Sequence, residues 1–205
     1  MTVIKNPEIL YNIFDEKDYN ILKEYLFSKT KTENNYNKDF GRYDFNDDLI
    51  DKYCERLIPI ARKHFNSKTL TPSYSLFAHY QGENASLPKH LDDNACTYTI
   101  DLCLYQSETW DIWVDEKPYT LQEGDALAYY GNDQEHFRKK FPNPKYGYTG
   151  MVFFHFVEPE HWWIKKGPSY IDVIRGYLTE DQWVIEQNYK KYLKSINKDK
   201  DNNES

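Results

Sequence analysis

The chain has 205 residues, 40% of them hydrophobic and 17% aromatic, so it can bury a core without disulfides or a structural metal. Its net charge of −7 argues against nucleic-acid binding, because that function requires a basic surface stripe. The three cysteines, Cys54, Cys96 and Cys103, show no metal-finger spacing, which predicts reduced thiols in the core.

Two helices are predicted in residues 1–70, which we expect to form a helical N-terminal support. The first begins at the capping residue Asp15, because apolar side chains between Tyr19 and Leu26 recur every three or four positions. The second begins at Asn46 or Asp47, and Pro59 is expected to kink or interrupt it. The intervening residues 29–46 are polar and predict a loop.

Residues 71–158 change to a period of two, which is typical of strands. Turn signals such as Glu123-Gly124-Asp125 and Gly131-Asn132-Asp133 separate the apolar runs. Short strands at this spacing predict a β-sandwich or jelly roll. The expected strands cover residues 75–80, 97–105, 110–114, 125–130 and 150–157.

The C-terminal segment, residues 159–196, is predicted to return to helix. Thr179 and Gln182 have the spacing of a capping box, and apolar residues follow them at helical intervals. We expect residues 197–205 to form a polar, disordered tail. The whole chain, residues 1–205, is expected to be a single domain.

The beginning of the sequence carries Lys5, Asn6, Pro7 and Glu8 where a secretory signal needs an apolar run. No segment approaches the length of a transmembrane helix. The expectation is therefore a cytoplasmic protein that does not contact a membrane.

Three residues have the chemistry of a metal site. His90 and Asp92 are two positions apart, so in an extended stretch both side chains point to the same face. His136 follows 46 residues after His90, beyond a strand and a turn, and a jelly roll can bring it opposite the first pair. Two histidines and one carboxylate leave coordination positions open, as non-heme iron oxygenases require. A pair of solvated surface residues is the alternative interpretation.

The residues around this triad resemble the prolyl-4-hydroxylase-like branch of the iron(II)/2-oxoglutarate-dependent dioxygenases. Tyr80 and Gly82 precede the His-x-Asp motif, a strand follows it, and Gly124-Asp125-Ala126 precedes His136. The order and the spacing both agree with the family pattern over residues 71–158. The resemblance implies a double-stranded β-helix, or jelly-roll, core that is mainly β, buttressed by N-terminal helices and a C-terminal helix.

The resemblance also implies the cofactors and the reaction. His90, Asp92 and His136 would bind Fe(2+), 2-oxoglutarate and O2 would be cosubstrates, and ascorbate is an optional reductant. Oxidative decarboxylation of 2-oxoglutarate would give succinate, and a C–H bond of the substrate would be hydroxylated. The retained Asp92 argues against halogenation, because related halogenases replace this carboxylate by a small residue.

The family anchors the far carboxylate of 2-oxoglutarate with a cation shortly after the second histidine. Lys145, nine residues after His136, is the best match, although it is separated from the last strand. Arg138 is the competing cation. Tyr148 and Tyr80 are candidate hydroxyl donors. The alternative for Lys145 is a solvated lysine in a turn.

The substrate is left open between a prolyl residue in a peptide or protein and a free amino acid or similar small molecule. Specificity is expected to lie in loops such as residues 29–43 and 106–113. A jelly-roll binding module of the cupin or lectin kind is the alternative function, and a protein that binds iron but not 2-oxoglutarate is a second one. The sequence leaves the oligomeric state open.

Overall fold

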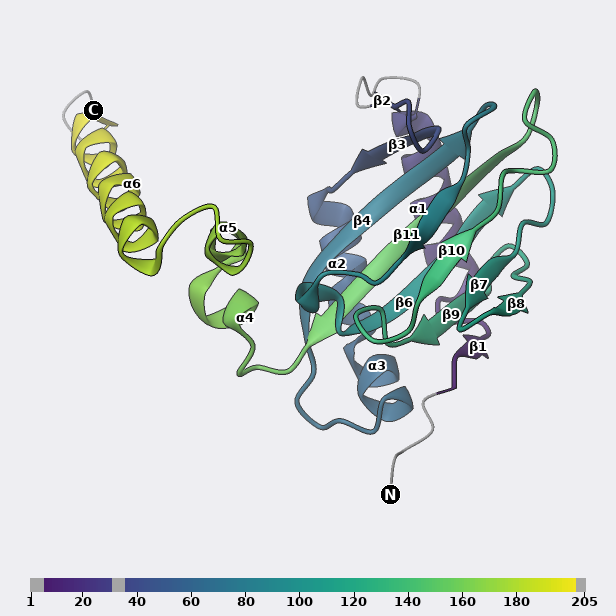
Figure 1. The fold of residues 1–205 in the computed structure, drawn as a ribbon, viewed down its shortest axis with the longest axis horizontal. Helices are drawn as coiled ribbons and strands as arrows, with labels where there is room; N and C mark the ends of the chain where they lie inside the picture. The colour runs from purple at the N-terminus through teal and green to yellow at the C-terminus, as the bar shows by residue number, and fades with distance from the viewer. Residues whose placement is uncertain (1–5, 31–35, 202–205) are drawn as a thin grey trace. The chain divides into compact units, whose positions relative to one another are not determined.

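A computed structural model describes residues 6–30 and 36–201 and divides the chain into two compact units, residues 1–159 and 160–205. The first unit contains two antiparallel sheets that face each other (Figure 1). The larger sheet has the strand order β1 (Glu8–Leu10), β9 (Ala126–Tyr129), β6 (Tyr98–Gln106), β11 (Tyr148–Val157), β4 (Thr71–Gln81), β3 (Arg42–Phe45) and β2 (Tyr36–Asn37). The smaller sheet has the order β5 (Leu87–His90), β10 (His136–Arg138), β7 (Ile112–Val114) and β8 (Lys117–Tyr119).

The connections between the sheets define the fold class. From β4 onward the chain alternates between the sheets, with β4, β6, β9 and β11 in the larger sheet and β5, β7, β8 and β10 in the smaller one. This alternation is that of a jelly roll, or double-stranded β-helix, and it confirms the predicted fold. It also makes β5 and β10 direct neighbours, although they are far apart in the sequence.

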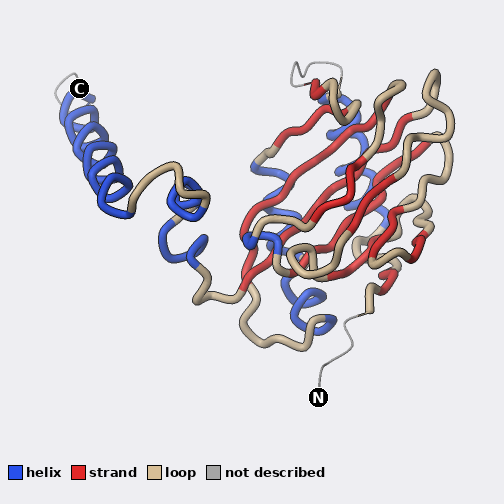
Figure 2. The backbone as a smooth tube through the Cα atoms, in the orientation of Figure 1, coloured by secondary structure: helices blue, strands red, loops and turns tan. Residues whose placement is uncertain are grey.

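Helices of the N-terminal part cover the outer face of the larger sheet (Figure 2). They are α1 (Glu16–Lys29), α2 (Asp48–Arg56) and α3 (Ile58–His64). Asp15 caps α1 with its side chain, as predicted, and Asp47, one of the two predicted candidates, caps α2. Pro59 lies in the first turn of α3. Leu22 and Ile50 are fully buried against this sheet face.

The predicted loop at residues 29–46 is wrong in part, because β2 and β3 lie within it. In β3 the polar Arg42 and Asp44 alternate with Tyr43 and Phe45, and Arg42 pairs with Tyr80 of β4. Because β3 contains polar residues, the search for alternating apolar residues did not predict this strand. Residues 31–35 of the predicted loop lie outside the described residues. The short strands β1, β8 and β10 were also not predicted.

The second unit is helical in its described residues. It contains α4 (Trp162–Lys166), a 3₁₀ turn η2 (Pro168–Tyr170), α5 (Ile171–Ile174) and α6 (Glu180–Asp201). The predicted capping box is present, because the Thr179 N–H donates to Gln182 Oε1 at 2.8 Å and the Gln182 N–H donates to Thr179 Oγ1 at 3.2 Å. Helix α6 extends to Asp201, past the predicted start of the tail, and residues 202–205 lie outside the described residues.

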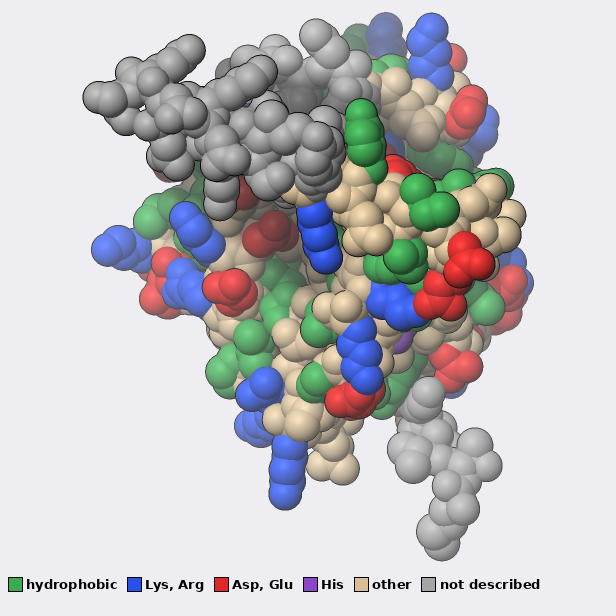
Figure 3. Space-filling model, turned by 90° about the vertical axis from the view of Figure 1, so that its left-hand side faces the viewer, with side chains coloured by type: hydrophobic (Ala, Val, Ile, Leu, Met, Phe, Trp, Pro, Cys, Tyr) green, Lys and Arg blue, Asp and Glu red, His purple; other side chains and the backbone are tan. Residues whose placement is uncertain are grey.

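Acidic and basic side chains are mixed on the face of the protein drawn in Figure 3. Across the described part of the chain, no helix combines the length and the apolar character needed to span a membrane.

Candidate active site

The two candidate histidines lie opposite each other on neighbouring strands. His90 ends β5, His136 begins β10, and the two residues are directly paired across the antiparallel ladder. Their ring centres are 4.3 Å apart. The antiparallel β5–β10 pairing therefore brings together two residues that are 46 positions apart in the sequence.

Asp92 joins the histidines from the loop after β5, not from an extended strand as the sequence argument assumed. Its N–H donates to the Gly131 carbonyl at 2.9 Å, which fixes the loop beside β10. Its Oδ1 lies 3.3 Å from His90 Nε2 and 3.5 Å from His136 Nε2. The three potential ligand atoms are thus within 4.8 Å of one another.

Hydrogen bonds select the histidine nitrogens that face Asp92. His90 Nδ1 lies 2.8 Å from the Pro88 carbonyl, and His136 Nδ1 lies 3.0 Å from the Gln134 carbonyl. A carbonyl only accepts, so each Nδ1 carries the proton and donates. In the neutral rings both Nε2 lone pairs are then directed toward Asp92, which is the arrangement of metal-ligating histidines.

The electrostatics of Asp92 also suit a ligand. Burial opposes its ionisation, but in the metal-free protein the hydrogen bonds that His136 and His90 donate when their Nε2 atoms carry protons outweigh burial and hold its pKa well below the usual range. A bound metal would take the place of those Nε2 protons. Gly131 leaves the space that this carboxylate occupies, since a Cβ there would lie 2.4 Å from Asp92 Oδ2. The described residues therefore fit a divalent metal bound by two neutral imidazoles and one carboxylate.

A second group of potential ligands, Asp92, Cys96 and His155, shares the carboxylate. Burial raises the pKa of the Cys96 thiol, and Cys96 Sγ lies 2.9 Å from the Tyr74 hydroxyl. A thiol that keeps its proton is a poor metal ligand. The group of His90, Asp92 and His136 therefore fits a metal better.

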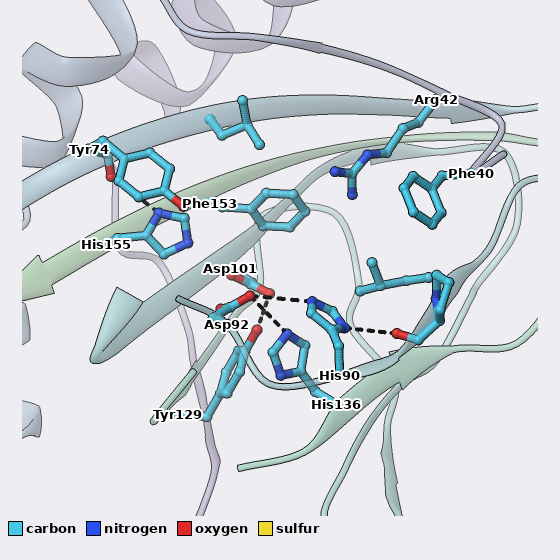
Figure 4. A pocket seen from close by; sticks show the side chains of 13 residues that line it. Phe40, Arg42, Tyr74, His90, Asp92, Asp101, Tyr129, His136, Phe153 and His155 are labelled. Carbon is cyan, nitrogen blue, oxygen red and sulfur yellow. Dashed lines mark hydrogen bonds and ion pairs between the residues drawn. The ribbon is translucent and has the colours of Figure 1, made fainter. Parts of the chain in front are cut away.

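The triad lies at the wall of a cavity of about 360 Å³ between the two sheets (Figure 4). Aliphatic and aromatic side chains form much of its lining, and they include Leu76, Leu87 and Phe153. The lining also carries two charged groups that the sequence analysis did not single out, Arg42 from β3 and Asp101 from β6.

Asp101 is a buried carboxylate with an incomplete set of hydrogen bonds. Its residue exposure is 2%, Tyr129 donates to its Oδ2 at 3.0 Å, and its Oδ1 has no hydrogen-bond partner in the described structure. Burial raises its pKa to about 7, and the charge of Asp92 adds to the rise. The alternation of side chains along β6 places Asp101 on the cavity side. An aspartate in a strand did not by itself predict a functional role.

Two of the predicted cosubstrate residues lie inside the jelly roll. Tyr80 is fully buried, and its hydroxyl accepts a hydrogen bond from Arg42 Nη1 at 2.9 Å. Arg138 is 4% exposed; its guanidinium donates to the Trp110 carbonyl, stacks on the Trp110 ring at 4.9 Å and approaches Met151 Sδ at 3.6 Å. Among the described residues no carboxylate forms an ion pair with Arg138.

The other two predicted residues lie nearer the surface, and none of the four lines the cavity. Lys145 is exposed in the loop between β10 and β11, and its Nζ lies 5.0 Å from the Tyr146 ring centre. Tyr148 is 37% exposed and packs near Phe27 and His79, on the helix-covered face of the larger sheet. Lys145 lies outside the cavity because it is in the long loop between β10 and β11, before β11 begins at Tyr148.

Neither a protein-family model nor a curated protein matches the sequence. Solved structures match the fold. The viral collagen prolyl hydroxylase of Paramecium Bursaria Chlorella virus-1 is 13% identical with a TM-score of 0.54, over 75% of this chain and 96% of that one. The Pseudomonas putida prolyl-4-hydroxylase is 12% identical with a TM-score of 0.56, over 76% of this chain and 94% of that one.

Structures outside the prolyl hydroxylases match as well. The α-ketoglutarate-dependent epimerase SnoN is 9% identical with a TM-score of 0.61, over 75% of this chain and 78% of that one. HygX from Streptomyces hygroscopicus, solved with nickel and 2-oxoglutarate, is 10% identical with a TM-score of 0.58, over 76% of this chain and 84% of that one. The chain thus shares its jelly-roll fold with prolyl hydroxylases and other non-heme 2-oxoglutarate-dependent enzymes.

Proposed function

We propose that the protein is an iron(II)- and 2-oxoglutarate-dependent dioxygenase that hydroxylates a C–H bond. One observation carries the proposal: the Nε2 atoms of His90 and His136 and Oδ1 of Asp92 converge within 4.8 Å, with both Nδ1 protons tied to backbone carbonyls. Two imidazoles and one carboxylate leave open positions on iron for a cosubstrate and O2. When bound, the iron, 2-oxoglutarate and O2 supply the oxidant.

The protein's own contribution is positioning and exclusion of water. The carbonyls of Pro88 and Gln134 fix the two imidazole rings, and the backbone of Asp92 is held by Gly131. Apolar side chains around the cavity keep bulk water from the reacting centre. Such support holds the ligand geometry that the chemistry requires.

For the far carboxylate of 2-oxoglutarate, burial supports Arg138 over the exposed Lys145, although Arg138 does not itself line the cavity. A buried guanidinium without a carboxylate partner is costly, and an anion bound in the interior offsets that cost. Arg138 lies on β10, two residues after His136. Its positive charge opposes the rise that burial causes in the pKa values of Tyr80 and Asp101. Tyr80 is then a candidate second contact.

The substrate is a prolyl residue of a peptide or protein, or a free amino acid or similar small molecule. Prolyl hydroxylases among the structural neighbours support this class, and one of them was solved with a peptide fragment of hypoxia inducible factor. SnoN is an epimerase, so the fold alone does not determine which reaction follows C–H attack.

Anaerobic protein titrated with iron(II) and 2-oxoglutarate tests the proposal through the charge-transfer absorption of the bound pair and through succinate release on admission of air. We expect both signals from the wild type and neither from His136→Ala. In Arg138→Met the absorption should require at least about tenfold more 2-oxoglutarate, because a charge-assisted hydrogen bond is lost.

Lys145→Ala is the matched control, since it removes a cation from the exposed loop, and it should behave as the wild type. Loss of 2-oxoglutarate binding in Lys145→Ala, with Arg138→Met unaffected, would identify Lys145 as the residue that binds the far carboxylate of 2-oxoglutarate. Absence of both signals from metal-loaded wild type would refute the oxygenase and favour a binding module.

A further inference from the structure

Arg42 is the one Lys or Arg among the described residues that line the cavity. It lies in β3, at the edge of the larger sheet, and its backbone pairs with Tyr80 of β4. Figure 4 shows its guanidinium pointing into the cavity on the side opposite Asp92 and His136. The jelly roll therefore holds the metal site and a cation on different walls of the same space.

The Arg42 side chain is held in place by contacts on two of its three nitrogens. Nε donates to Asp44 Oδ2 at 2.8 Å, and Nη1 donates to the Tyr80 hydroxyl at 2.9 Å. The rings of Phe40 and Tyr80 lie 5.4 and 5.5 Å from the guanidinium carbon. Arg42 is thus oriented before any ligand binds, which reduces the entropy lost on binding.

The third nitrogen is available to a ligand. Nη2 makes no hydrogen bond to any residue that the structure describes, and the side chain is 17% exposed. Its free N–H groups, together with the adjacent edge of Nη1, match the planar geometry of a carboxylate. The neighbouring walls are apolar, with Leu76, Leu87 and Phe153.

We propose that the substrate is a small, largely apolar molecule with a free carboxylate, such as a free aliphatic amino acid, and that Arg42 binds this carboxylate. The inference rests on the proposed function, and it chooses the small molecule over a prolyl residue inside a peptide. Only a terminal residue of a peptide has a free α-carboxylate, and a cavity of about 360 Å³ is at the small end of ligand pockets.

The cosubstrate also carries carboxylates, so the same chemistry has two sources. Arg138 distinguishes them, because it is a second buried cation and, unlike Arg42, which pairs with Asp44, it has no ion-pair partner among the described residues. With Arg138 on the cosubstrate, Arg42 is left for the substrate. The two assignments predict opposite effects of the two substitutions on 2-oxoglutarate binding.

The experiment measures binding to nickel-substituted protein loaded with 2-oxoglutarate, by calorimetry or thermal shift. The probes are the common free L-amino acids, their C-terminal amides, and a prolyl tripeptide blocked at both ends. We expect at least one free acid with an apolar side chain to bind at least about tenfold more tightly than its amide, as a charge-assisted hydrogen bond requires.

Arg42→Gln should weaken binding of that acid by about tenfold or more, leave its amide nearly unchanged, and retain the iron–2-oxoglutarate absorption. Lys38→Gln, which removes an exposed cation from the turn before β3, should match the wild type. Arg138→Met should instead lose 2-oxoglutarate.

Three results overturn the inference: no free acid binds, the blocked peptide or the amides bind as well as the acids, or Arg42→Gln loses 2-oxoglutarate while Arg138→Met keeps it. Absence of the iron–2-oxoglutarate absorption in the wild type is a different failure, that of the proposed function. The preference for acid over amide is a binding result, so it is scored separately from succinate release.

Discussion

Replacing Asp101 by Asn should make the metal-free protein more stable at alkaline pH. Burial raises the pKa of this carboxyl from 3.8 to about 7. Each tenfold change in proton affinity corresponds to about 1.4 kcal/mol, so ionising Asp101 in the folded state costs about 4 kcal/mol relative to the unfolded chain. The cost is large because its Oδ1 has no hydrogen-bond partner in the described structure.

The sign follows from proton binding. Between pH 4 and pH 7 the folded protein keeps the Asp101 proton while the unfolded chain releases it, so stability from this group falls as pH rises. Asp92 acts in the other direction, because its pKa is lowered. The stability that its ionised form contributes is lost only as pH falls below about 4. Burial lowers the pKa of His155, so this histidine favours the folded state as pH rises. It is present in both the wild type and Asp101→Asn, so its contribution cancels in the comparison.

The assay is urea unfolding of chelator-treated wild type and Asp101→Asn between pH 4.5 and pH 8.5. The stability of the variant relative to the wild type should rise by about 3 to 4 kcal/mol across this range. Asp39→Asn, at an exposed turn position, is the control and should change by less than about 0.5 kcal/mol. A difference between Asp101→Asn and wild type that stays constant with pH would refute the reasoning.

Three further substitutions test other parts of the structure. Gly131→Ala places a Cβ 2.4 Å from Asp92 Oδ2 and 2.7 Å from the Cys96 carbonyl, so it should displace the carboxylate and weaken nickel binding about tenfold or more in a calorimetric titration. Arg138→Met should leave metal-free protein at least as stable in urea, because it removes a buried cation that has no ion-pair partner among the described residues; a loss above about 2 kcal/mol would contradict this. Thr179→Ala removes the N-cap acceptor of α6 and should cost about 1 kcal/mol of helix stability, seen as reduced helical circular dichroism, while Thr179→Ser should retain it.

The grouping of His90, Asp92 and His136 was predictable in part from a local signal. His90 and Asp92 are two positions apart, and the turn before His136 returns the chain to the neighbouring strand. Helix caps are local too, and side-chain type before an apolar repeat identified Asp15 and narrowed the second cap to Asn46 or Asp47. The His90–Asp92 spacing and the helix caps depend on chemistry within a few residues of the chain, whereas the position of His136 depends on the pairing of β5 and β10.

The cavity's charged residues were less accessible to sequence reasoning, because their roles depend on which strands become neighbours. Arg42 lies in a segment whose polar residues suggested a loop, and only its pairing with β4 places it beside Tyr80. Asp101 is the single charged residue in a largely buried strand. For Lys145 the spacing to His136 was misleading, since loop length rather than sequence distance decides where β11 begins.

One unsatisfied polar group in the described residues lies where a ligand would bind, and a second belongs to the residue that holds Arg42. In the described residues, three buried side-chain atoms lack a hydrogen-bond partner, and two of them belong to Asp101, which lines the cavity, and to Asp44, which holds Arg42. Arg138 adds a buried cation without an ion pair. Buried polar groups without partners are costly, and a ligand that donates a hydrogen bond to Asp101 or binds the Arg42 guanidinium would offset part of that cost at the cavity wall. The guanidinium of Arg42 on the cavity wall is the reason we assign a carboxylate ligand to this cavity.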